Sequence, residues 1–224
     1  MKNKERGNFM KILFIGNSHT FVHYVPLRVK AYLEENGVQA DVVMQTHPGM
    51  GLDWHLKQSP TYFNLIYGDY DAVVLQHNAH PFPGKESLLS SGIEMKKLIP
   101  EKTKVYLYMT WSEKNNPEGQ AIMSESYEEL GEKIGAAICP VGEIWWKVKE
   151  NYPDELYFDD GEHTSVFGAS LAAVVIARAF LNKDMDIEEC YKDAKKLQEL
   201  KMDDRLIDMT MKDGQYDMCP LKDI

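Results

Sequence analysis

Short apolar runs alternate along this chain with longer segments in which apolar residues recur at helical spacing. The apolar runs predict buried strands at 11–15, 38–44, 71–75, 104–109 and 137–141. The helical spacing predicts helices at 27–35, 86–98, 124–138 and 166–181. Pro26 at the start and Gly37 just past the end are the usual boundaries of a helix. Strands that alternate with helices indicate an α/β fold with a mostly parallel sheet.

The helix predicted at 166–181 is apolar on nearly all sides, so we expect it to lie between the sheet and other elements. From Asp186 onward the pattern is amphipathic, which predicts C-terminal surface helices packed on the main body. We therefore expect a three-layer α/β/α sandwich with a mostly parallel five-stranded sheet. Residues 11–224 form a single domain in this interpretation, and residues 1–10 are a polar N-terminal tail.

Composition and charge narrow the class of protein. The chain has 224 residues, long enough for one sizeable core, with 25 basic and 35 acidic residues and a net charge of −10. This balance argues against broad binding to nucleic acid or to an anionic membrane. Cys139, Cys190 and Cys219 form no CxxC pair, which suits reduced thiols. The first residues are polar and the apolar run after them is short, so we expect no signal peptide and a cytoplasmic location.

Polar residues gather where the predicted strands end. Ligands of open α/β sheets bind outside the carboxyl ends of the strands. Six of the seven histidines follow the first three predicted strands: His19, His23, His47, His55, His77 and His80. A zinc site is one interpretation of this cluster, but no HExxH or other tight ligand spacing is present. We favour polar lining of a substrate cleft or structural histidines, and expect no metal and no cofactor.

Two short segments suggest the chemistry. Ser18 directly follows the first strand, and Asp160 stands three residues before His163, just ahead of the long apolar helix. A serine hydroxyl needs an imidazole to take its proton, and a carboxylate to orient that imidazole. Ser18 alone would be a turn residue or a helix cap. Together with the Asp/His pair it predicts a Ser-His-Asp hydrolase, with the adjacent Asp159 as an alternative orienting residue.

Four blocks of the chain occur in the order of a known family. Residues 14–20, Gly51, Asn78 and residues 160–163 resemble the conserved blocks of the SGNH (GDSL-like) hydrolase superfamily. The resemblance implies a flavodoxin-like α/β/α sandwich, the SGNH hydrolase fold. Three departures stand out. Asn17 replaces the usual Asp, His19 replaces Leu, and the third block reads Gln76-His77-Asn78-Ala79 where the family usually has Gly-x-Asn-Asp.

The resemblance also implies roles. Ser18 would be the nucleophile, His163 the base and Asp160 its orienting carboxylate. The oxyanion hole would consist of the backbone N–H groups of Ser18 and Gly51 and the side-chain amide of Asn78. Gly49 competes with Gly51 for this role, because the turn at 47–51 holds two glycines.

Three further residues are candidates for substrate contact. We expect His77 and His80 to line the cleft because they follow the third strand, and Trp111 to form an apolar or sugar-stacking wall. Aromatic residues near a cleft are more often part of the core, which is the alternative for Trp111.

The expected function is hydrolysis of small carboxylic esters through an acyl-enzyme. Substrates in the superfamily include acetylated sugars, lysophospholipids, acyl thioesters and simple esters. A polar strand edge without a hydrophobic lid favours a short acyl group, such as acetyl on a carbohydrate. Three alternatives stay open: a metal-dependent hydrolase that uses the histidines, a non-catalytic SGNH-like binding protein, and a flavodoxin-like phosphate binder. The departures at Gln76 and Ala79 favour the second, and the lack of a glycine-rich phosphate loop weakens the third.

Overall fold

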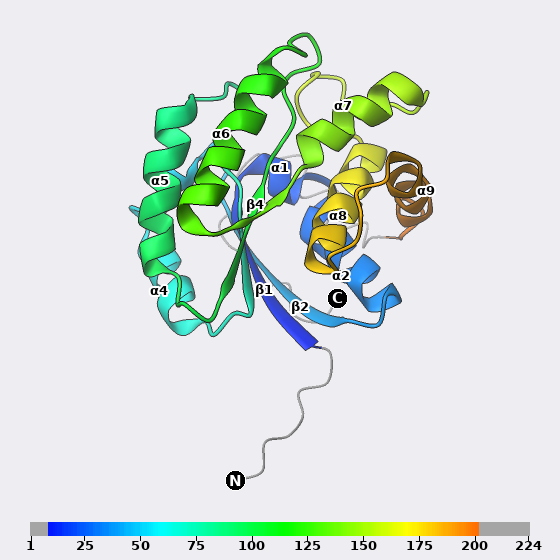
Figure 1. Cartoon of the computed structure of the whole chain (residues 1–224). Helices are drawn as coiled ribbons and strands as arrows, with labels where there is room; N and C mark the ends of the chain where they lie inside the picture. Colours follow the sequence, from blue (N-terminus) through cyan, green and yellow to red (C-terminus); the bar gives the residue numbers. More distant parts are fainter. Residues whose placement is uncertain (1–8, 202–224) are drawn as a thin grey trace.

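A five-stranded parallel sheet forms the centre of the molecule (Figure 1). The computed structural model describes residues 9–201 of the chain. The strands are β1 (Phe9–Gly16), β2 (Gln39–Thr46), β3 (Ala72–Leu75), β4 (Lys104–Tyr108) and β5 (Ala137–Cys139), in the spatial order β2-β1-β3-β4-β5. This is the flavodoxin-like order. The prediction of an α/β/α sandwich with five strands is confirmed.

Helices cover both faces of the sheet (Figure 1). They are α1 (Ser18–Phe21), α2 (Val25–Glu35), α3 (Leu52–His55), α4 (Ser59–Tyr67), α5 (Lys85–Leu98), α6 (Gly119–Ile134), α7 (Val141–Asn151), α8 (Val166–Phe180) and α9 (Ile187–Leu197), with a short 3-10 turn at Val22–Tyr24. Helices α2, α7, α8 and α9 pack on one face, and α3, α4, α5 and α6 on the other. No helix among residues 9–201 is long and apolar enough to cross a lipid bilayer.

Alternation along the central strand supplies both cores. Ile12 and Phe14 of β1 face α2 and α8, while Leu13 and Ile15 face the opposite helices, and all four are buried. A parallel sheet covered on both sides buries both faces of its inner strands, which is why residues 12–15 of β1 and 72–75 of β3 are continuous apolar runs in the sequence. Helix α8 is buried almost throughout, as its apolar sequence predicts.

Some element boundaries differ from the prediction. Helix α6 ends at Ile134 rather than at 138, because Gly135 adopts φ +64 and its N–H bonds to the Gly131 carbonyl. Residues 137–139 are thereby free to form β5. The predicted tail 1–10 overlaps β1, since Phe9 and Met10 pair with β2; residues 1–8 lie outside the described part. Helices α1 and α3 are too short to show periodicity, and α4 exposes much of its apolar surface.

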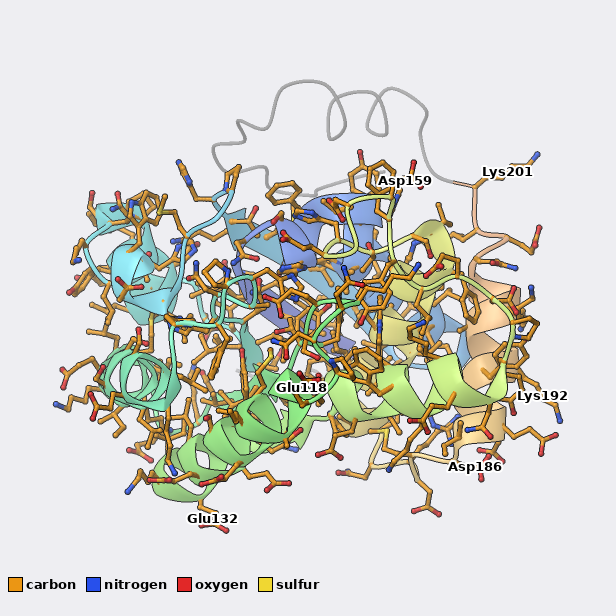
Figure 2. The ribbon with its side chains drawn as sticks, turned by 90° about the horizontal axis from the view of Figure 1, so that it is seen from above. Glu118, Glu132, Asp159, Asp186, Lys192 and Lys201 are labelled. Atoms are coloured by element: carbon orange, nitrogen blue, oxygen red, sulfur yellow. The ribbon has the colours of Figure 1, made fainter. Side chains whose placement is uncertain are left out.

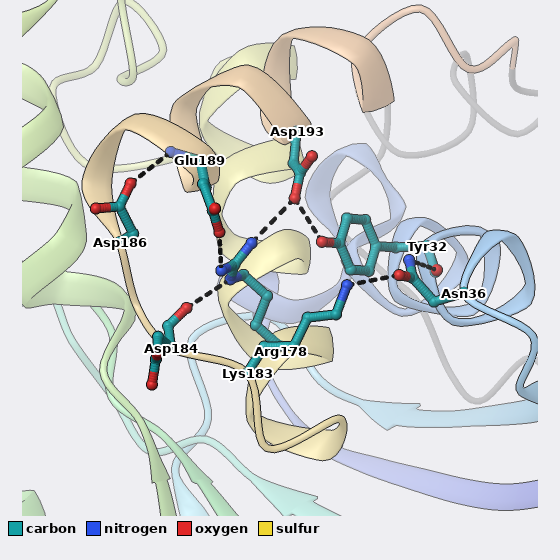
Figure 3. A network of polar contacts seen from close by, with 8 residues as sticks. All are labelled: Tyr32, Asn36, Arg178, Lys183, Asp184, Asp186, Glu189 and Asp193. Atoms are coloured by element: carbon teal, nitrogen blue, oxygen red, sulfur yellow. Dashed lines mark hydrogen bonds and ion pairs between the residues drawn. The ribbon is translucent and has the colours of Figure 1, made fainter.

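An ionic network joins α9 to the body (Figure 3). The buried guanidinium of Arg178 in α8 lies 2.6 Å from Glu189 and 3.2 Å from Asp193, both in α9. The Tyr32 hydroxyl of α2 donates to the same Asp193 carboxylate. The predicted C-terminal surface helix is therefore present at 187–197, held to two helices of one layer. Cys219 and the rest of the chain beyond 201 lie outside the described residues.

Candidate active site

The turn that carries Ser18 follows β1 directly. Ser18 is the first residue of α1, and the side chain of the preceding Asn17 accepts the His19 N–H at 3.1 Å. Position 16 has no room for a side chain. A Cβ on Gly16 would lie 2.4 Å from Gln76 Oε1 and 2.5 Å from Thr20 Oγ1. Gly16, two residues before Ser18, thus permits a close approach between this turn and the end of β3.

Gln76 binds the same turn through two hydrogen bonds. It is fully buried, and its Oε1 accepts the backbone N–H of Asn17 at 2.8 Å and the Thr20 hydroxyl at 3.0 Å. These two donors flank Ser18 in the sequence. Gln76 is one of the departures from the family pattern. Gln76 therefore positions the turn that carries Ser18.

The loop at 158–163 carries the Asp/His pair. It is closed by a hydrogen bond from the Phe158 N–H to the His163 carbonyl at 2.7 Å. Asp160 Oδ1 accepts the backbone N–H groups of Glu162 and His163, both at 2.9 Å. Partial burial raises the pKa of Asp160, but these bonds and the one from the His163 ring outweigh it and hold the pKa below its ordinary value.

The structure brings the three sequence-predicted residues into one hydrogen-bonded line. His163 Nδ1 lies 2.7 Å from Asp160 Oδ2, and His163 Nε2 lies 2.8 Å from Ser18 Oγ. With the proton on Nδ1, the Nε2 lone pair can accept the serine proton. Asp159, the alternative orienting residue, is exposed at the outer surface of the molecule (Figure 2).

The oxyanion candidates Gly49, Gly51 and Asn78 lie close to one another. Asn78 Nδ2 donates to the Gly49 carbonyl at 2.7 Å, and both residues line the cavity at the serine. Gly51 begins α3 and packs so tightly that a Cβ would lie 2.1 Å from Asn78 Oδ1. Gly51 is buried and is not part of the cavity lining. Both glycines therefore touch Asn78, and the choice between their N–H groups stays open.

A cavity of about 380 Å³ opens over these groups. Its apolar lining includes Phe21, Val22, Pro48, Ala79 and Phe158. Its polar lining consists of Asn17, Ser18, His19, Gly49, Asn78, His80, Asp160, Glu162 and His163. The cavity lies at the carboxyl ends of the strands, where an α/β sheet binds its ligands.

Two predicted substrate contacts need correction. His77 is fully buried, with Nδ1 accepting the Leu52 N–H at 3.0 Å and Nε2 at 3.2 Å from Ser87 Oγ. Trp111 is also fully buried, and its indole N–H donates to the Glu162 carbonyl at 2.8 Å. Neither residue lines the cavity, because the first packs under α3 and the second stacks on Trp145. His80 lines the cavity, and its contact with substrate stays a prediction.

Two further histidines of the wall are uncharged. Burial lowers the pKa of His19 well below its ordinary value, and His80 and His163 lower it further. Burial also lowers the pKa of His80, whose Nε2 lies 2.9 Å from the Trp111 carbonyl. The His19 ring stacks on that of His163 at 5.0 Å between centroids. Within residues 9–201 no three His, Cys, Asp or Glu side chains gather in a way that could hold a metal ion.

Comparison with known proteins identifies the fold. No protein-family model matches the chain, and no curated protein matches it. A solved DUF4886 family protein from Bacteroides uniformis has a TM-score of 0.66 and 16% identity, over 85% of this chain and 93% of that one. A lipase/acylhydrolase from Enterococcus faecalis has a TM-score of 0.62 and 19% identity, over 77% of this chain and 96% of that one. Axe2, an acetylxylan esterase from Geobacillus stearothermophilus, has a TM-score of 0.58 and 17% identity, over 77% of this chain and 93% of that one. Together with the strand order, these similarities show that the chain has the SGNH hydrolase fold.

Proposed function

We propose that this protein is a serine hydrolase that cleaves small carboxylic esters through Ser18, His163 and Asp160. The observation that carries the proposal is the unbroken line from hydroxyl to imidazole to carboxylate, with separations of 2.8 and 2.7 Å. A hydroxyl in hydrogen-bond contact with an oriented imidazole is the arrangement that activates a serine nucleophile.

The geometry supports a two-step reaction. His163 Nε2 takes the Ser18 proton as Oγ attacks the acyl carbon, and Asp160 stabilises the imidazolium that forms. When the tetrahedral intermediate collapses, the imidazolium gives its proton to the leaving alcohol and an acyl-serine remains. A water molecule, activated by the same imidazole, then attacks the acyl-serine and releases the acid.

The negative oxygen of each intermediate needs fixed donors. We assign them to the backbone N–H of Ser18, the Asn78 amide and the N–H of Gly51 or Gly49. Asn78 uses one amide hydrogen to bind the Gly49 carbonyl, and the other is available for the oxyanion. Each such donor typically contributes about 3–4 kcal/mol to transition-state stabilisation.

For the substrate we propose a short acyl ester, with an acetyl group on a carbohydrate as the preferred case. A cavity of about 380 Å³ with both apolar and polar lining suits a small group. Similarity to an acetylxylan esterase supports the choice. Two solved Axe2 variants described as catalytic mutants replace a serine and a histidine by alanine. We propose no metal and no cofactor for this reaction.

The test is labelling with a fluorophosphonate probe, followed by mass-spectrometric mapping of the modified residue. We expect the label on Ser18, and the Ser18→Ala variant should lose both labelling and nearly all turnover of a short acyl ester while folding normally. Ser90→Ala is the matched control, because Ser90 is a surface residue of α5 that bonds only to its own helix. A label on another residue, or near-normal turnover by Ser18→Ala, would reject the proposal.

A further inference from the structure

Glu162 is held in place between the two acid–base residues of the loop. Its N–H donates to Asp160 Oδ1 at 2.9 Å, and its carbonyl accepts the Trp111 indole N–H at 2.8 Å. Its side chain lines the cavity beside His163. The backbone of Glu162 is thus fixed on both sides of its Cα, and Glu162 is part of the cavity lining.

Within residues 9–201, the cavity wall holds acidic side chains but no lysine or arginine. Among the residues of the described range 9–201 that line the cavity, the only acidic or basic side chains apart from histidine are those of Asp160 and Glu162. Asp160 binds the His163 ring, whereas no ion pair joins Glu162 to a cation within residues 9–201. Glu155, the nearest carboxylate before the loop, is by contrast paired with Lys114 at 2.6 Å. The free negative charge at the cavity therefore comes from Glu162.

The histidines of the wall do not offset that charge. Burial lowers the pKa of both His19 and His80, which favours the neutral form of both rings. The bond to the Trp111 carbonyl and the negative charges of Glu113 and Glu162 raise the pKa of His80, against the larger effect of burial.

The part of the substrate that meets Glu162 follows from the direction of proton transfer. In the proposed reaction His163 gives its proton to the leaving oxygen, so the alcohol part must lie on the side of the loop at 158–163. Phe158, from the same loop, is 38% exposed and lines the same cavity. An apolar ring and a carboxylate are therefore what the alcohol part contacts.

We propose that Glu162 is a specificity-determining residue that makes the site select esters of uncharged or cationic alcohols and reject esters whose alcohol part is anionic. This inference rests on the proposed function and names the substrate class of the same site. An uncharged polyhydroxyl alcohol fits best, because its hydroxyl groups can donate to the carboxylate while its carbon skeleton packs on Phe158. An anionic headgroup or a uronate would meet like-charge repulsion.

The experiment compares two acetyl esters whose alcohol parts differ in charge and by one methyl group: methyl para-acetoxybenzoate, which is neutral, and para-acetoxybenzoate, which is an anion. Each kcat/KM is divided by the rate of hydroxide hydrolysis of the same ester, which removes the difference in chemical reactivity. We expect the native protein to prefer the neutral ester by about three- to tenfold at low salt, and less at high salt. In Glu162→Gln most of the preference should disappear.

The control is Glu132→Gln, which changes the net charge equally but lies on α6, well away from Asp159 and the loop at 158–163 (Figure 2). It should keep the full preference. If the native protein hydrolyses both esters equally well, or if Glu162→Gln keeps the preference, the inference is overturned while the hydrolase assignment stands.

If neither ester is hydrolysed, the proposed function fails, and binding still tests the inference. Ligand-observed NMR would then compare methyl para-hydroxybenzoate with para-hydroxybenzoate on the native protein and on Glu162→Gln. A preference for the neutral compound that is lost in the variant supports the role of Glu162. Equal binding of the two compounds to the native protein refutes it.

Discussion

The most direct test of how the sequence builds this site is the replacement Gln76→Leu. Leucine nearly fills the space of glutamine but has no acceptor. The Asn17 N–H, at 2.8 Å from Gln76 Oε1, and the Thr20 hydroxyl, at 3.0 Å, would both lose their partner in a buried environment. Each buried donor left unsatisfied costs about 1–3 kcal/mol, so the free energy of unfolding should fall by about 2–5 kcal/mol.

Urea unfolding of a double-mutant cycle measures this effect, with Thr20→Val as the second change. Valine removes one of the two stranded donors, so the double variant should be more stable than the sum of the single changes predicts, by about 1 kcal/mol or more. Gln58→Leu is the control, because the Gln58 amide is only half-buried and its bond to the Trp54 carbonyl is long, at 3.3 Å. If the effects of Gln76→Leu and Thr20→Val on the free energy of unfolding are additive to within about 0.5 kcal/mol, the hydrogen bond between Thr20 and Gln76 is refuted as a source of stability. Turnover should also fall in Gln76→Leu, since Ser18 lies between the two donors.

Two further predictions concern the loop and the response to pH. Trp111→Phe deletes the hydrogen bond to the Glu162 carbonyl and should lower kcat about tenfold or more. The control is Trp146→Phe, which loses a 3.1 Å bond to Ser112 Oγ away from the cavity and should leave kcat nearly unchanged. Equal kcat values for the two variants would contradict the role of Trp111 in positioning the loop. Burial lowers the pKa of His55 and His77 from 6.5 to about 4, so below pH 6.5 the unfolded chain binds protons that the folded protein does not. The free energy of unfolding should therefore fall as the pH drops from 6.5 to 4, and urea midpoints that stay level over this range would show the reasoning to be wrong.

The fold is largely predictable from the sequence because its strands are buried on both faces. Residues 12–15 are apolar at every position for that reason, and the same holds for residues 72–75. The residues of the hydroxyl–imidazole–carboxylate line are also recognisable, since Ser18 and His163 stand at loop positions beside regular elements. Their spacing of 145 positions in the chain carries no geometric information, and only the fold brings them to 2.8 Å.

The parts that sequence reasoning missed depend on tertiary partners. Trp111 and His77 follow strands as cavity residues do, but whether a side chain turns into the cavity or into the core is decided by its neighbours. Trp111 turns inward because Trp145 offers a stacking partner 3.9 Å away, and His77 because α3 presents the Leu52 N–H. Gln76 departs from the family pattern, so the resemblance suggested a loss of function there. A signal was available, since a buried-strand end followed by Gln has an acceptor that a nearby turn can use.

The core also determines where the acid–base loop lies. Trp111, just past β4, is clamped against Trp145 of α7 with the two rings nearly parallel, at an interplanar angle of 5°. From this fixed position its N–H reaches the Glu162 carbonyl, one residue before His163. The net stabilisation from one such bond is only about 1 kcal/mol, but a shift of about 1 Å at a catalytic group can cost a hundredfold in rate. The bond from Trp111 should therefore matter far more to turnover than to folding, because it ties the position of the imidazole to a fully buried pair of stacked tryptophans.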